Sequence, residues 1–345
     1  MDRIEFPDEV RALVEQFDEA HQTTTLLRAR FRSGKSGAFV GLVDCQGTHD
    51  GVFVLKIASG LAGEHEKQRH LRALELQVFQ KKIPELIDSF QAQESYLLLL
   101  QIAGRSRIDW RPLVESLHIF ASGYKALVKA LWSPAHFSLG EQEQGKTLVP
   151  DLLGYRLTVG RGRIVHHARA FLGSDTATAR AFHHLGEVLP NPLHFALELS
   201  QYTVPLFRPL TGPCHGDCHA ANPIVAAGHD GTVRDINLID LASFSEKAPF
   251  FYDTSYLELA TLLRQMDGIG QERWRNVTSA LAQLNEAAAS DLEQFERAWV
   301  ADIFSGRKLL SELVERGYGD RKDDLTLQLL LSQVAAGLCF ILNKA

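Results

Sequence analysis

Three polar side chains in the second half of the chain, Asp217, Asn222 and Asp240, have the types and spacing that suit chemistry on phosphate groups. Asn222 follows Asp217 by five positions, and Asp240 comes at the end of a hydrophobic run. A carboxylate can orient an attacking hydroxyl, and Mg²⁺ takes carboxylate and amide oxygens as ligands. The pattern therefore predicts Asp217 as a catalytic base and Asn222 and Asp240 as magnesium ligands that converge around one nucleotide.

Each of these residues also has an ordinary explanation when it is taken alone. Asp and Asn are common turn formers because their side chains bond to nearby backbone groups. The functional interpretation depends on the combination, in which His215-Gly216-Asp217 precedes Asn222 and the apolar-flanked Asp240.

Zinc binding is a competing interpretation of the same loop, which carries Cys214, His215, Cys218 and His219. Two cysteines four residues apart with interleaved histidines do not have the spacing of a zinc finger or ribbon, and no second cysteine pair follows. We therefore prefer the magnesium interpretation.

The elements that must position these residues change character along the chain. A short amphipathic helix is expected at 7–20, followed by strands at 26–31, 38–43 and 51–57. A helix at 62–80 and a further extended pair that ends at 96–100 complete this part. Three strands, a helix and two strands predict a small antiparallel sheet with one helix packed on it.

Beyond residues 101–104 the sequence is mainly helical, which predicts an α+β protein with a small first lobe and a larger helical second lobe. Apolar residues recur at helical spacing in seven segments: 114–132, 176–188, 192–199, 254–266, 274–284, 289–304 and 325–342. The segment 134–173 has no clear pattern.

Composition narrows the class of protein. The chain has 345 residues, a formal net charge of −6 and a hydrophobic content of 45%. The acidic balance argues against a nucleic-acid partner, since phosphate neutralisation needs a basic face. No signal peptide and no apolar run long enough for a membrane span is visible. Four cysteines are too few for a disulfide framework, so we expect a cytoplasmic protein.

The loop and strand motifs resemble those of the aminoglycoside phosphotransferase and choline kinase branch of the protein-kinase-like fold. That family has the loop His-Gly-Asp-x-x-x-x-Asn, matched by residues 215–222, and a metal-binding Asp in an apolar strand, matched by Asp240. The resemblance implies a two-lobed fold with ATP in the cleft, a structural role for His215, and Asp253 as a brace of the loop. It also implies an N-terminal nucleotide-binding domain at 1–103 and a catalytic and substrate domain at 104–345.

The resemblance extends to the N-terminal part. Lys56, inside an apolar run, matches the lysine that grips the nucleotide phosphates, and its partner is expected to be a helix glutamate. Glu64 is preferred because it falls on the expected apolar stripe, and Glu66 is the alternative. The turn Ser33-Gly34-Lys35-Ser36-Gly37 matches a phosphate-covering turn, although a plain hairpin also explains it. The family's adenine-binding hinge corresponds to Gln101, Ile102 and Ala103.

Two departures from the family pattern bear on function. Leu241-Ala242 follows Asp240, as is usual for the branch that acts on small molecules, and Pro223 follows Asn222, which weakens the metal assignment. The resemblance implies transfer of the γ-phosphate of ATP, assisted by Mg²⁺, to a hydroxyl of a small molecule. A nucleotide sensor without turnover and an atypical protein Ser/Thr kinase remain alternatives. The sequence leaves the acceptor and the oligomeric state open.

Overall fold

The computed structural model of the chain describes residues 4–31, 37–76, 79, 81–103, 110–132, 135–157, 163–184, 186–198, 205–265, 269–282 and 292–340. The chain forms two compact units. Unit 1 comprises Met1–Leu113 and Asn222–Phe244, and unit 2 comprises Val114–Ala221 and Ser245–Ala345. Unit 1 thus takes a segment from the second half of the chain, which a single boundary between residues 103 and 104 does not describe. That boundary stays a prediction about domains.

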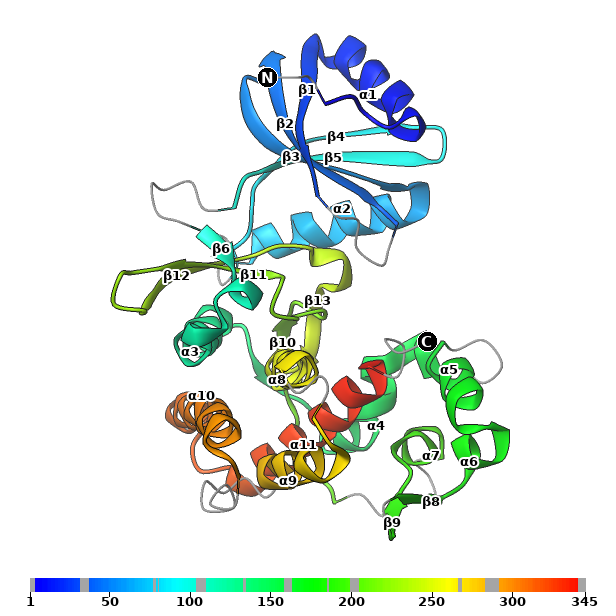
Figure 1. Cartoon of the computed structure of the whole chain (residues 1–345), viewed down its shortest axis with the longest axis vertical. Coiled ribbons are helices and arrows are strands. Elements are labelled where there is room, and N and C mark those ends of the chain that lie inside the picture. Colours follow the sequence, from blue (N-terminus) through cyan, green and yellow to red (C-terminus); the bar gives the residue numbers. More distant parts are fainter. Residues whose placement is uncertain are drawn as a thin grey trace. The chain divides into compact units, whose positions relative to one another are not determined.

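The main sheet of unit 1 has five strands in the order β1-β2-β3-β5-β4, and all neighbouring strands are antiparallel. Figure 1 shows it with helix α1 (Asp8–His21) on one face and α2 (Gly60–Glu75) on the other. The strands are β1 (Thr23–Arg30), β2 (Phe39–Gly47), β3 (Gly51–Ser59), β4 (Leu86–Ala92) and β5 (Ser95–Gln101). This arrangement confirms the predicted α+β class and the predicted antiparallel sheet.

The two faces of the sheet bury different residues because side chains alternate along a strand. Leu55 and Ile57 of β3 join Phe17 of α1 in one apolar cluster. Lys56 lies between them in sequence and therefore points to the opposite face, where α2 packs. The Lys56 side chain is thus directed towards α2, the helix that carries its ion-pair partner.

Helix α2 differs from the prediction in its ends and in its buried face. It ends at Glu75 rather than near residue 80, and Leu71 of the expected stripe is exposed. The buried residues are Gly63, Glu66, His70 and Ala73. A Cβ atom at Gly63 would lie 2.2 Å from Cβ of Tyr96, so the glycine lets α2 approach β5 closely. The predicted apolar face of α2 was wrong because this helix packs through small and polar side chains.

A second sheet of unit 1 has the strand order β12-β11-β6. Its strands are β6 (Trp110–Pro112), β11 (Pro223–Ala227) and β12 (Val233–Leu238). A short 3₁₀ turn, η5 (Leu241–Ser243), follows β12, and the Arg69 guanidinium of α2 donates a hydrogen bond to the Ala242 carbonyl. Residue 240 is therefore held between a strand and a turn that is tied to α2.

Unit 2 is mainly helical. Its helices are α3 (Phe120–Leu131), α4 (Glu143–Leu153), α5 (Arg163–Leu172), α6 (Ser174–Thr178), α7 (Pro192–Leu197), α8 (Tyr252–Gln265), α9 (Gln271–Ala282), α10 (Gln294–Tyr318) and α11 (Lys322–Phe340). The small sheet β13-β10-β7 contains β7 (Ser138–Leu139), β10 (Leu210–Cys214) and β13 (Ser245–Pro249). Among the described residues, no helix combines the length and the apolar character that crossing a membrane requires.

The helix expected at 176–188 is wrong. Helix α6 ends at Thr178, and the hairpin of β8 (Ala181–His184) and β9 (Glu187–Pro190) follows. Gly186 in the turn has φ of 81°, which a right-handed helix does not contain. Phe182 of β8 therefore pairs with Leu189 of β9 across the hairpin, so these apolar residues do not line one side of a helix.

A buried charged group joins three helices of unit 2. Glu258 of α8 accepts hydrogen bonds from Arg307 Nη2 of α10 at 2.6 Å and from the Tyr124 hydroxyl of α3 at 2.6 Å. All three residues are buried. A Cβ atom at Gly306 would lie 1.6 Å from the Tyr124 ring, so only glycine allows α10 to lie this close to α3.

Candidate active site

The central feature of unit 1 is the ammonium group of Lys56, which lies between two carboxylates. Lys56 Nζ is 2.6 Å from Glu66 Oε1 and 3.0 Å from Asp240 Oδ1. Lys56 lies in β3, Glu66 lies in α2, and Asp240 is the second residue after the end of β12. Two consecutive elements and a residue 184 positions after Lys56 therefore place their charges at one point within unit 1.

The ion pair corrects the preferred partner of Lys56, because Glu66 and not Glu64 makes the contact. Glu64 instead accepts a hydrogen bond from Gln68 on the outer side of α2. The helical phase was inferred from leucines that the structure leaves partly exposed, so it pointed to the wrong glutamate. Glu66 lies on the stripe shared by Gly63 and His70.

The charges of this cluster depend on one another. Burial alone lowers the pKa of Lys56, but Asp240 and Glu66 outweigh it, so the lysine pKa is raised and the ammonium is retained. Burial raises the pKa of Glu66 by more than the attraction of Lys56 lowers it. The ion pair thus holds Lys56 in place while the buried carboxylate stays costly to ionise.

Replacing Glu66 by Gln should therefore not destabilise the protein at neutral pH. The pKa of Glu66 is higher in the folded protein than in the unfolded chain, where it is about 4.3, so the protonated carboxyl group stabilises the fold at pH below that value. This stabilisation is lost as pH rises through the folded-state pKa. Glu66→Gln is neutral throughout, so it should equal the parent near pH 4 and match or exceed it near pH 7. Urea unfolding at both pH values measures the difference.

Glu64→Gln is the matched control with the opposite sign. Hydrogen bonds from Tyr96 and Gln68 lower the pKa of Glu64, so its contribution is present above the unfolded pKa and is lost as pH falls. The Glu64 variant should therefore lose stability relative to the parent as pH rises. A Glu66→Gln variant clearly less stable than the parent at neutral pH would contradict this account of the ion pair.

Asn222 and Asp240 come together at one end of the second sheet. Pro223 pairs with Leu238, and the Ile239 N–H donates to the Asn222 carbonyl at 3.1 Å, so Asp240 is the next residue along. Pro223 is the first residue of β11, a position where proline is tolerated. Amide and carboxylate oxygens form a donor set that suits Mg²⁺, and 42% of the Asp240 side chain is exposed. The donor types of these two residues therefore suit a magnesium ion, and their role as its ligands stays a prediction.

Asp240 has a left-handed backbone, with φ of 63° and ψ of 68°. Such a conformation is uncommon outside glycine, although Asp tolerates it better than most residues. It redirects the chain from β12 into η5 and leaves the Asp240 side chain at Lys56. Local strain of this kind is often found at functional sites.

The loop that carries Asp217 is braced by Asp253 from the first turn of α8. The Asp253 carboxylate accepts hydrogen bonds from the backbone N–H of His215 at 2.6 Å and of Gly216 at 2.9 Å. It also accepts one from the Cys214 thiol at 3.2 Å. This is the bracing role that the family resemblance implies for Asp253.

Within this loop, the buried His215 ring accepts a hydrogen bond through Nδ1 from the Asp217 N–H at 3.3 Å. The Asp217 side chain is 37% exposed, and its Oδ2 is 4.0 Å from His219 Nε2. Sequence reasoning considered His219 only as a zinc ligand and missed its position beside Asp217. The alternating His-x-Asp-x-His pattern is the signal that could have shown it.

Cys214 and Cys218 differ from typical metal ligands. Both are buried, and burial together with the Asp253 charge raises the pKa of each thiol well above its usual range. The Cys214 thiol donates to Asp253, and among the described residues the ligand atoms of this loop do not gather into a group of three or more that could hold a metal ion.

The remaining predicted nucleotide-binding residues lie in less informative places. Ser33, Gly34, Lys35 and Ser36 lie outside the described residues. Gly37 is exposed with φ of 71°, a left-handed conformation that suits a glycine turn. Gln101 ends β5 and donates its N–H to the Glu85 carbonyl, and Ile102 and Ala103 follow it, half-buried. Asp217 belongs to unit 2 and the Lys56 cluster to unit 1, so the convergence of the predicted site residues stays a prediction.

Comparison with known proteins gives matches among solved structures, whereas no family model and no curated protein matches the chain. Aminoglycoside phosphotransferase APH(3'')-Id from Streptomyces rimosus is 16% identical, with 88% of this chain and 99% of that chain covered and a TM-score of 0.41. A thermostable APH(4)-Ia mutant, solved with AMP-PNP and hygromycin B, is 12% identical, with 94% and 99% covered and a TM-score of 0.44.

Macrolide 2'-phosphotransferase type I is 14% identical, with 96% of this chain and 99% of that chain covered and a TM-score of 0.37. These matches are enzymes of the group that the sequence motifs resemble. At such identities and TM-scores they do not identify a substrate or a catalytic residue for this chain. The chemistry must therefore be argued from its own residues.

Proposed function

We propose that this protein is an ATP-dependent phosphotransferase that moves the γ-phosphate to a hydroxyl group of a small molecule. The observation that carries the proposal is Lys56, buried and held between Glu66 and Asp240. An ammonium group has three hydrogens, and among the described residues these carboxylates accept two of them. The third is suited to a phosphate oxygen, and the two ion pairs fix its direction before the nucleotide arrives.

In this proposal Asn222 and Asp240 hold Mg²⁺ through their side-chain oxygens. A bound magnesium ion would neutralise charge on the phosphates. Asp240 then has a double role, because it also contacts Lys56, and it couples the phosphate-binding lysine to the metal position. Glu66 supports both functions by holding the lysine from the other side.

Asp217 is proposed to accept a hydrogen bond from the attacking hydroxyl and to take up its proton. Its partly exposed carboxylate is accessible to an acceptor, while Asp253 and His215 fix the backbone around it. A pure nucleotide sensor has no use for such a base. The acceptor is proposed to be a small molecule, and the four cysteines, none of which is in a disulfide, agree with a reducing cytoplasm.

The test is a screen of hydroxyl-bearing metabolites and antibiotics for acceptor-dependent ATP consumption by the full chain. Asp217→Asn should lower the transfer rate on the order of 100-fold and leave nucleotide binding intact, since general-base catalysis contributes about this much. Calorimetric titration with ADP and Mg²⁺ measures binding separately. Asp50→Asn, an exposed aspartate in the turn after β2, is the matched control.

Each possible result of these measurements distinguishes the proposed function from one alternative. Nucleotide binding without transfer to any acceptor would favour a sensor, and labelled phosphate on protein instead of metabolites would favour a protein kinase. Full transfer by the Asp217 variant would contradict its role as the base.

A further inference from the structure

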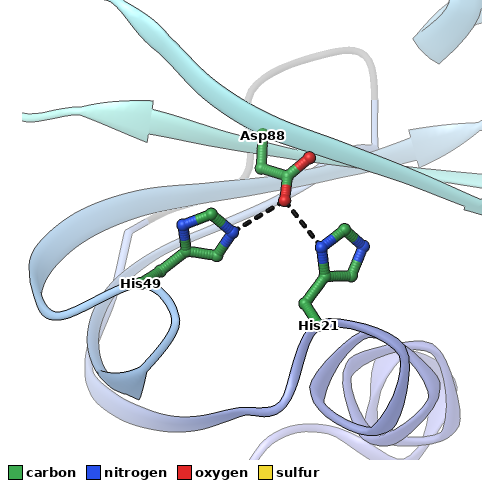
Figure 2. Close-up of side chains that lie close together, drawn as sticks. All are labelled: His21, His49 and Asp88. Carbon is green, nitrogen blue, oxygen red and sulfur yellow. Dashed lines mark hydrogen bonds and ion pairs between the residues drawn. The ribbon is translucent and has the colours of Figure 1, made fainter.

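A second cluster of polar side chains lies in unit 1, on the side of the sheet that α1 covers. It consists of His21, His49 and Asp88, and Figure 2 shows both imidazole rings directed at the same carboxylate oxygen. His21 Nδ1 is 2.8 Å and His49 Nε2 is 2.7 Å from Asp88 Oδ2. The three atoms all lie within 4.8 Å of one another. Among the described residues, no other set of three or more His, Cys, Asp or Glu side chains gathers its ligand atoms in this way.

Three elements supply the cluster, and each ends or bends where its ligand is placed. His21 is the last residue of α1, and Gln22 in a left-handed conformation turns the chain into β1. His49 lies in the turn between β2 and β3. Asp88 follows a bulge in β4, where the register with β5 shifts by one residue. A bulge re-aims side chains, and Asp88 consequently faces the helix side.

The rings and the carboxylate are held by their surroundings. Phe17 of α1 stacks on His21 with ring centroids 4.5 Å apart and lies nearly parallel to His49 at 6.1 Å. Phe90 packs edge-on against His21 at 5.8 Å. The second oxygen of Asp88 accepts the Ser89 N–H at 2.7 Å. An apolar shell and an outer hydrogen bond are features that orient ligands in metal sites.

We propose that His21 Nδ1, His49 Nε2 and Asp88 Oδ2 form a binding site for a divalent transition metal, best matched by Zn²⁺. Two imidazole nitrogens and one carboxylate oxygen are donors that zinc accepts, whereas magnesium and calcium prefer oxygen alone. The side chains are 26%, 17% and 22% exposed, respectively, so solvent reaches the group and water can supply the fourth ligand.

Metal binding requires the three ligand atoms to become about equally spaced. Zinc with ligands at about 2.0–2.1 Å in a tetrahedron keeps neighbouring ligand atoms about 3.3 Å apart. Each distance from a nitrogen to the carboxylate oxygen must therefore lengthen by about half an ångström, and the two nitrogens, which lie within 4.8 Å of each other, must come to about 3.3 Å as the metal replaces the hydrogens. Each nitrogen then presents a lone pair in place of an N–H group.

The site connects α1, the β2–β3 turn and β4. His49 follows His21 by 28 residues, and Asp88 follows His49 by 39 residues. Because such a site does not exist in the unfolded chain, metal binding adds directly to the stability of the folded state. The role of this metal would be structural. It is independent of the proposed phosphotransfer, since none of its ligands belongs to the Lys56 cluster.

The experiment uses the full chain stripped of metal with a chelator and titrated with zinc chloride in excess Mg²⁺. Calorimetry should show one saturable site, and zinc at about 100 times its dissociation constant should raise the midpoint of thermal unfolding by roughly 4 °C. Cobalt in place of zinc should give the visible absorption of a tetrahedral nitrogen and oxygen site, without the sulfur charge-transfer band that cysteine ligation produces.

His49→Gln keeps an N–H donor for Asp88 but removes the ligand, and Asp88→Asn is the second variant. Each should weaken zinc binding by at least about 100-fold, since loss of an outer partner alone costs 10–100-fold. His65→Gln, at an exposed histidine on α2, should bind zinc like the parent. Absence of saturable binding by the parent, or unchanged binding by both variants, would show that the cluster is only a hydrogen-bonded group.

Discussion

Asp240→Asn is expected to lower the rate of phosphoryl transfer at least about 1,000-fold. The amide can still accept a hydrogen bond from Lys56, so the 3.0 Å contact has a substitute and the fold should persist. The substitution removes the negative charge that we propose to hold magnesium, and metal stabilisation of transition-state charge is worth several kcal/mol. Rates measured over a magnesium titration, with circular dichroism as a check of folding, give the result.

Asp235→Asn provides the matched control for this substitution. Asp235 lies in β12, the strand that leads to Asp240, and it also pairs with a lysine, since Lys82 Nζ is 2.6 Å from its carboxylate. Loss of this partly exposed ion pair should leave transfer within a few-fold of the parent. Equal loss of rate in both variants would mean that disturbance of β12, and not the charge at residue 240, explains the effect.

Arg307→Met should destabilise the protein by about 3–5 kcal/mol, the usual cost of leaving a buried charge without its partner. Arg307 donates to Glu258 through Nε and Nη2 and to the Leu281 carbonyl through Nη1 at 2.8 Å. Methionine has a similar length but no donor, so among the described residues the Glu258 carboxylate would keep only the Tyr124 hydroxyl as a partner. Urea unfolding of the full chain measures the change.

Two further variants identify the cause of that loss. Arg316→Met alters the same helix at a side chain that is 74% exposed and weakly paired with Glu312, so it should change stability by less than about 0.5 kcal/mol. Glu258→Gln combined with Arg307→Met removes the stranded charge while keeping a partner for Tyr124, and it should recover part of the loss. No recovery in the double variant would attribute the cost to packing instead of charge.

The parts of the site that are close in sequence could be predicted from sequence. Asn222 and Asp240 are joined by one hairpin, and their placement follows from the pairing of Pro223 with Leu238. The pairs β1–β2, β2–β3 and β4–β5 were predictable for a similar reason, because strands that follow one another directly in the sequence are neighbours there, whereas the pairing of β3 with β5 skips α2 and β4. Local spacing and alternation carry this information.

The parts that depend on packing between elements could not be read in this way. Choosing Glu66 over Glu64 requires the buried face of α2, which Gly63 sets by allowing close contact with Tyr96. The cluster of His21, His49 and Asp88 shows no motif, because its members meet only through sheet register and a bulge. Hydrophobic periodicity cannot describe a helix that packs through glycine, glutamate and histidine.

The path of the chain through the two units limits how this protein can be dissected. It passes from one unit to the other after Leu113, Ala221 and Phe244. A fragment that stopped at residue 113 would keep Glu66 beside Lys56 but would lack Asp240, and β6 would lose its partner β11. Any recombinant piece meant to keep the complete Lys56 cluster therefore has to include residues 222–244, joined by a linker or supplied as a second polypeptide.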